Sequence, residues 1–155
     1  MARRAKPRII ESNTIRFRIL VVLYERYYAT NGDDFTGIST IVKKAGLQDV
    51  DIKSVRGEIR YLKEKNRIKY DPEDDKIPPK VAITVNGIDT TEEITDEMLD
   101  QIPRQLRNPP LNREVDKLED ATSQERTKKL FEFTKKYRDV AWLLPKVCKK
   151  IFRKL

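Results

Sequence analysis

Apolar residues recur with helical spacing in the first part of the chain and predict three helices. The first helix, over 14–30, is predicted from one apolar face: Ile15, Ile19, Val22, Leu23 and Tyr27. The turn signal Asn31-Gly32 ends it. A second helix is expected to be capped by Thr36 or Ser39 and to end at Gly46. Asp51 caps a third helix that runs to about residue 65 and directs four apolar side chains inward: Ile52, Val55, Ile59 and Leu62.

The next segment alternates between apolar and polar residues and predicts a β-hairpin. Residues 67–70 form a short strand, 71–79 form a turn rich in acids and proline, and 81–85 form the returning strand. A fourth helix is predicted from about Gly87 to Leu99. Prolines in the segment 101–121 suppress helix and predict a linker, with room for a short helix around 112–118.

The C-terminal segment, 122–155, carries an apolar heptad pattern: Leu130, Phe133, Tyr137, Val140, Leu144, Val147 and Ile151. Proline disfavours helical geometry in the residue before it, so Pro145 predicts two helices, 123–143 and 146–154. So large an apolar face must be covered. We expect dimerisation or partner docking. Packing against the first helix and contact with an anionic membrane are the alternatives, and the membrane is the least favoured.

The core residues of the third helix leave a polar face outward, and the candidate DNA-binding residues lie on this helix: Lys53, Ser54, Arg56, Gly57, Arg60 and Lys63. The order helix, turn, basic helix, strand, turn, strand is that of a winged helix-turn-helix. GISTIVKKAGLQDVDIKSVRGEIRYLKEKNRIKY and PKVAITVNGIDTTEEI resemble the winged-helix domains of archaeal and bacterial transcription regulators. The resemblance covers residues 14–100, and winged helices also serve as protein-binding modules.

The resemblance implies that helix 51–65 reads the major groove of duplex DNA. Arg56 and Arg60 are one turn apart, and arginine can pair bidentately with guanine; the alternative is that both contact only phosphate or solvent. Gly57 could allow close approach to DNA, or it could be a suboptimal surface position.

The net charge of +8 favours a polyanionic partner, although a merely soluble basic protein is the alternative. The charge is +5 over residues 1–18, −5 over 19–121 and +8 over 122–155, with a local +4 over 51–70. The N-terminal arm contributes four more candidate DNA-binding residues: Arg3, Arg4, Lys6 and Arg8. Such arms enter the minor groove or remain solvated.

The predicted wing departs from the family pattern, because residues 71–76 hold four acids and one lysine. Acids repel phosphate, so we expect this wing to point away from DNA or to meet a basic protein surface. A carboxylate metal site there is a weak alternative.

The absence of histidine excludes His-based catalysis and His-containing metal sites, and the single cysteine, Cys148, excludes an intrachain disulfide and a Cys-rich zinc site. There is no phosphate-cradling glycine loop and no convincing pair of nucleophile and base. We therefore expect no enzyme, no cofactor and no metal. The lone cysteine and the lack of a signal-like apolar stretch favour a cytoplasmic location.

Taken together, the sequence predicts an α+β, mostly α fold: a winged helix-turn-helix of three helices and a small β-wing, with a C-terminal helical extension. The expected parts are an arm (1–13), the winged-helix domain (14–100), a linker (101–121) and basic amphipathic helices (122–155). The expected function is sequence-specific binding of double-stranded DNA by a homodimeric transcription regulator. A protein-interaction module in a larger assembly is the main alternative, and a general nucleic-acid packaging protein is another.

Overall fold

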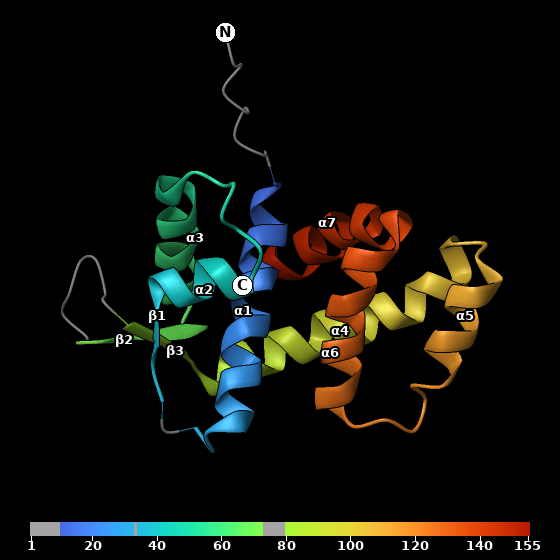
Figure 1. Ribbon diagram of the computed structural model, residues 1–155, viewed down its shortest axis with the longest axis horizontal. Coiled ribbons are helices and arrows are strands. Elements are labelled where there is room, and N and C mark those ends of the chain that lie inside the picture. Colours follow the sequence, from blue (N-terminus) through green and yellow to red (C-terminus); the bar gives the residue numbers. More distant parts are fainter. Residues whose placement is uncertain (1–9, 33, 73–79) are drawn as a thin grey trace, which may run out of the picture.

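A computed structural model describes residues 10–32, 34–72 and 80–155; the basic arm and most of the acidic turn lie outside them. The elements follow the order α1 (Ser12–Ala29), β1 (Thr36–Gly37), α2 (Ile38–Lys44), α3 (Ile52–Glu64), β2 (Ile68–Asp71), β3 (Lys80–Ile83), α4 (Val85–Gln105), α5 (Pro109–Asp116), α6 (Ser123–Lys136) and α7 (Arg138–Phe152). The fold is therefore α+β and mostly α, as predicted (Figure 1).

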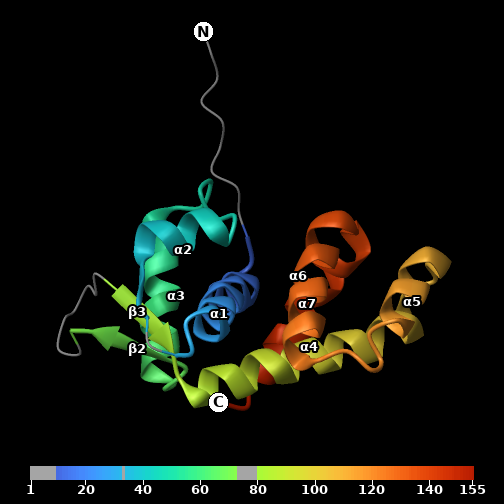
Figure 2. The same ribbon diagram turned by 60° about the horizontal axis from the view of Figure 1, so that its bottom comes forward.

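Helix α1 lies at the centre of the fold, with α3 on one side and the pair α6 and α7 on the other (Figures 1 and 2). The sequence predicted a single apolar face, but Phe17, Leu20 and Val21 on its other sides are also buried. The middle turns of α1, residues 19–24, are thus apolar and buried on all sides, as in a helix that lies inside a core. Its N-cap is Glu11, whose carboxylate accepts a hydrogen bond from the Thr14 amide at 3.1 Å.

The start of α2 differs from the prediction, and its end agrees. Thr36 does not cap the helix, because it pairs with Val81 in the sheet, and the capping position is Gly37. Gly46 has a φ of +68°, the left-handed geometry that ends a helix. Asp51 caps α3 as predicted, since its carboxylate accepts a hydrogen bond from the Lys53 amide at 3.0 Å.

The three strands form an antiparallel sheet in the order β1-β3-β2. The predicted hairpin is present as β2 and β3, with Ile68 opposite Ile83 and Tyr70 opposite Val81. Ile68 and Tyr70 are buried while their neighbours in β2 are exposed, which is the expected alternation. The returning strand ends at Ile83 rather than at residue 85, because Thr84 already caps α4.

Helix α4 starts earlier and ends later than the sequence indicated, so the predicted linker is much shorter than 101–121. The Thr84 hydroxyl accepts a hydrogen bond from the Gly87 amide at 3.1 Å and starts the helix at Val85. Pro103 lies in the last turns and does not end the helix, because a proline there removes a single backbone hydrogen bond. After Leu106, the Asn108 side chain caps α5, whose first residues are prolines.

The C-terminal segment bends at Tyr137 and not at Pro145. Tyr137 has extended geometry, with φ −115° and ψ 114°, and both ends α6 and precedes α7. Pro145 lies inside α7. A proline in a helix interior costs about 3 kcal/mol, and the burial of the leucines and valines around it offsets that cost.

The heptad face of α6 and α7 is buried within the same chain, against α1 and α4. Of the alternatives for covering this face, packing onto the first helix is therefore the one observed. Residues of 14–100 and of 122–155 pack in one hydrophobic core. A homodimer through α6 and α7 would have to use their polar sides.

Ion pairs join the basic C-terminal helices to the acidic side of α4. They are Arg126–Asp96 at 3.0 Å, Lys150–Glu97 at 3.0 Å and Lys154–Glu93 at 3.8 Å. A buried hydrogen bond between the hydroxyls of Thr95 and Thr127, 3.1 Å long, lies beneath them. The opposite net charges of the middle and the end of the chain thus partly neutralise each other inside the fold.

Candidate nucleic-acid interface

Helix α3 is held by an apolar seam along one side. Val55, Ile59 and Leu62 are fully buried, and the helix packs against α1 and β2. These residues follow one another at spacings of four and three, so they line one face of the helix. The opposite face is left free for a partner.

The predicted DNA-binding residues gather on that free face. With about 100° of rotation per residue, Lys53, Arg56, Gly57 and Arg60 fall within an arc of about 100°. All four are exposed, and Ser54 is exposed beside them. A Cβ atom added at Gly57 would meet no atom within 4 Å, so the chain's own packing does not require glycine there.

The cations on this face are free of internal partners. Lys53, Arg56 and Arg60 make no ion pair with any residue that the structure describes. Other arginines have partners within the chain: Arg26 pairs with Asp34, and the Arg67 Nε donates a hydrogen bond to the Thr90 hydroxyl at 2.8 Å. The uncompensated positive charge of α3 is therefore available to a polyanion.

Two residues of α3 are placed differently from the prediction. Ile52, expected in the core, is 43% exposed. It adds an apolar group beside the cations, and apolar side chains can contact the methyl group of thymine. Lys63 is half-buried, and its ammonium lies 5.3 Å from the centre of the Tyr70 ring, so it turns towards the sheet.

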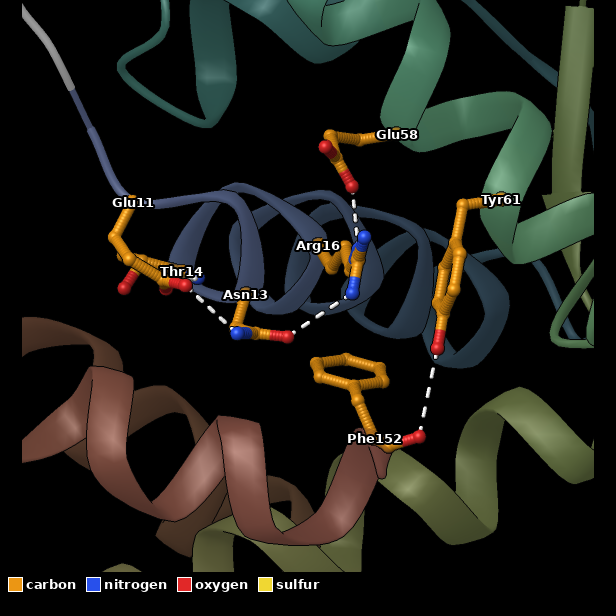
Figure 3. Close-up of polar contacts among 7 residues, drawn as sticks. All are labelled: Glu11, Asn13, Thr14, Arg16, Glu58, Tyr61 and Phe152. Carbon is orange, nitrogen blue, oxygen red and sulfur yellow. Dashed lines mark hydrogen bonds and ion pairs between the residues drawn. The ribbon is translucent and has the colours of Figure 1, made fainter. Parts of the chain in front are cut away.

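A cluster around Arg16 fixes how α3 lies on α1 and α7 (Figure 3). The Arg16 guanidinium pairs with Glu58 and donates a hydrogen bond to the Asn13 side chain at 3.0 Å. It also lies 3.5 Å from the centre of the Tyr61 ring and 5.8 Å from that of Phe152. The Tyr61 hydroxyl donates a hydrogen bond to the Phe152 carbonyl oxygen at 3.4 Å. Sequence patterns gave no sign of this cluster, since its members come from three separate helices and Tyr61 and Phe152 alone are 91 residues apart.

The arm and the acidic wing remain predictions. The arm residues Arg3, Arg4, Lys6 and Arg8, and the acids at 73–75, lie outside the described residues. The described chain begins at Ile10, just before α1, and the Arg16–Glu58 pair places the start of α1 beside α3.

The single thiol, Cys148, is not placed as a reactive site. Cys148 is buried, and this burial raises the pKa of its thiol well above the usual value, so the reactive thiolate is disfavoured. Among the described residues, no helix is both long enough and apolar enough to cross a bilayer.

The exposed face of α3 is thus a basic surface with one glycine and one isoleucine on a firmly held helix. Comparison with known proteins adds no family to this description. No protein-family model, curated protein or solved structure shows significant similarity to the chain.

Proposed function

We propose that this chain is a winged-helix protein that binds double-stranded DNA with the outer face of α3 in the major groove. The observation that carries the proposal is the row of exposed, internally unpaired cations on α3: Lys53, Arg56 and Arg60. A helix held by one apolar seam and cationic on the opposite side has the arrangement that major-groove readers use.

The order of the elements supports the winged-helix part of the proposal. The chain runs α1, β1, α2, α3, β2, β3, and the strands pair in the order β1-β3-β2. In this arrangement α2 and α3 form the helix-turn-helix, and the hairpin of β2 and β3 is the wing. Helices α4 to α7 extend the domain and share its core.

Sequence readout is assigned to Arg56 and Arg60, because both are long enough to reach base edges and neither is held by another side chain of the described residues. A bidentate arginine–guanine pair contributes about 1–3 kcal/mol of discrimination against other bases. Lys53 and the arm would add attraction to phosphate that does not depend on sequence.

The cellular role we infer is transcription regulation in the cytoplasm, without catalysis, by occupying a DNA site. A homodimer would place two copies of α3 on the two halves of a palindrome. Because the heptad face is buried, the dimer contact would have to lie on another surface.

The experiment that tests this function is selection from a pool of random duplexes, followed by fluorescence anisotropy on the enriched sequences across a salt series. We expect a common site whose binding survives competition by random duplex at moderate salt. Equal binding of all duplexes would mean that the protein binds DNA only through attraction to its phosphates, without reading the sequence. No binding even at about 50 mM salt would overturn the proposal and favour a protein-interaction module.

A further inference from the structure

The outer face of α7 forms a second basic surface, separate from α3. Five residues lie there, within an arc of about 80° at about 100° per residue: Arg138, Trp142, Lys146, Lys149 and Arg153. All five are exposed, and Trp142 is 62% exposed. At about 1.5 Å per residue the stripe is about 22 Å long. Asp139, at the edge of the stripe, is the one acid of α7.

The stripe keeps its positive charge. Lys150 and Lys154, on the side of α7 nearest α4, are paired with Glu97 and Glu93. In contrast, Arg138, Lys149 and Arg153 form no ion pair within the part of the chain that the structure describes. The charge of these three side chains is therefore available to an anionic partner.

Trp142 gives the stripe an aromatic platform. Its indole ring is largely solvent-exposed, and the Lys146 ammonium lies 3.6 Å from the ring centre. A large aromatic side chain is rarely left in water beside cations without a use in recognition. An exposed aromatic ring among cations can stack an unpaired base while the cations neutralise the neighbouring phosphates.

The buried side of α7 favours a nucleic acid over a lipid surface as the partner of the outer face. A helix that lies on a membrane needs its apolar face for the acyl chains. That face of α7 is in the core, with Val140, Leu144 and Val147 all buried. What remains outside is cationic with a single indole, which suits a hydrated polyanion better than a bilayer.

We propose that the outer face of α7 binds single-stranded nucleic acid, with phosphates on Arg138, Lys146, Lys149 and Arg153 and an unpaired base stacked on Trp142. This site is distinct from the duplex-binding face proposed for α3 and does not depend on it. Phe152 links the end of α7 to α3 through Tyr61, so one folded unit carries both surfaces.

The test uses Trp142 as its own reporter, because it is the only tryptophan of the chain. The full chain is titrated with an oligothymidylate of about 20 nucleotides, longer than one stacking site requires. We expect quenching of the Trp142 emission and an affinity that falls steeply with salt. K146Q/K149Q/R153Q should weaken binding by about tenfold or more. K150Q, which removes a cation already paired with Glu97, should change it by less than about threefold.

Two further variants separate this site from the rest of the molecule. R104A, which removes an exposed arginine of α4 outside both proposed surfaces, should bind the oligothymidylate as the wild type does. W142A should lose affinity, with an unchanged melting temperature showing that the fold is intact. Oligothymidylate that binds by anisotropy without altering Trp142 emission would overturn the proposal. A blue shift of the Trp142 emission on phosphatidylserine vesicles, with no response to the oligonucleotide, would also overturn it. Equal losses of oligothymidylate affinity in the triple variant and in K150Q would do the same.

Discussion

The guanidinium of Arg16 in α1 lies 3.5 Å from the centre of the Tyr61 ring in α3. The same guanidinium pairs with Glu58, one turn before Tyr61. Tyr61 in turn contacts Phe152 at the end of α7, with ring centres 6.3 Å apart. The orientation of α3, and with it the direction of its free cationic face, is therefore set jointly by the first helix and the last.

Replacing Arg16 should destabilise the fold. In R16A, Glu58 is left half-buried without its cation and the Tyr61 ring loses its contact with the guanidinium, so we expect the free energy of unfolding to fall by about 1–3 kcal/mol. Urea denaturation measures this value. R104A removes an exposed partner of Asp100 within α4 and should cost less than about 0.5 kcal/mol. Similar losses in the two variants would show that the Arg16 cluster contributes no more than a surface pair.

The shared core predicts that the two halves of the chain unfold together. Trp142 emission reports on the C-terminal helices, while far-UV circular dichroism reports on all helices. Because one core joins α1 to α6 and α7, we expect both signals to give the same denaturation midpoint. Two separate transitions would contradict this and would restore the sequence-based division at about residue 121.

Two glycines should respond to alanine in opposite directions. At Gly57 a Cβ meets nothing within 4 Å, so G57A should stabilise the protein by about 0.5–1 kcal/mol through helix propensity. At Gly87 a Cβ would lie 2.1 Å from the Arg67 carbonyl oxygen. We therefore expect G87A to destabilise it by about 1–3 kcal/mol. Thermal and urea denaturation of both variants measure these effects.

The larger variant G57L tests the role of Gly57 in binding. Leucine is a good helix former, so the fold should be at least as stable as the wild type. If α3 enters the groove closely at this position, duplex affinity should fall by about tenfold or more, since the side chain would hold the helix away. Unchanged duplex affinity would mean that Gly57 is only a suboptimal surface position.

The contact between α7 and α4 should weaken in acid. The hydrogen bonds that the Lys150 ammonium and then Gln101 donate lower the pKa of Glu97 from its ordinary value of 4.5. The folded state thus binds fewer protons than the unfolded state, and the pair stabilises the fold above pH 4.5. This stabilisation is lost as the pH falls through the lowered pKa. E97Q should therefore lower the melting temperature at about pH 7, and its difference from the wild type should shrink as the pH falls below 4.5.

Glu92, also in α4, should affect stability in the opposite direction to Glu97, because its pKa is raised and not lowered. Desolvation by burial, followed by repulsion from Asp89, raises the pKa of Glu92. Its ionised form is therefore disfavoured in the folded state, and E92Q should raise the melting temperature near pH 7, with a gain that shrinks as the pH falls. Parallel pH profiles for E97Q and E92Q would contradict these two assignments.

The local patterns of the chain predicted its elements well where one residue type decides the geometry. Asp51 as a cap, Gly46 in left-handed geometry and the alternation in β2 were all readable from the sequence. The prediction failed where long-range packing overrides a local signal. Pro103 and Pro145 were expected to break helices, yet both lie within helices that the core holds in place.

The candidate site was predictable only in part. Helical spacing identified the outer face of α3, because burial of Val55 and Ile59 dictates which residues point away. It could not show that Ile52 is exposed or that Lys63 turns towards Tyr70. Nor could it show which cations are paired: Arg16 and Arg56 look alike in the sequence, but a partner from a distant helix holds only Arg16.

The most direct test of the central claim compares R56A and R60A with wild type on a selected duplex and on random duplex, by competition anisotropy at fixed salt. R104A, an exposed arginine of α4, controls for the loss of one charge. If these side chains read bases, each variant loses about 1–3 kcal/mol on the selected site, and its affinity for random duplex falls far less. An equal loss on both duplexes would contradict base readout by α3.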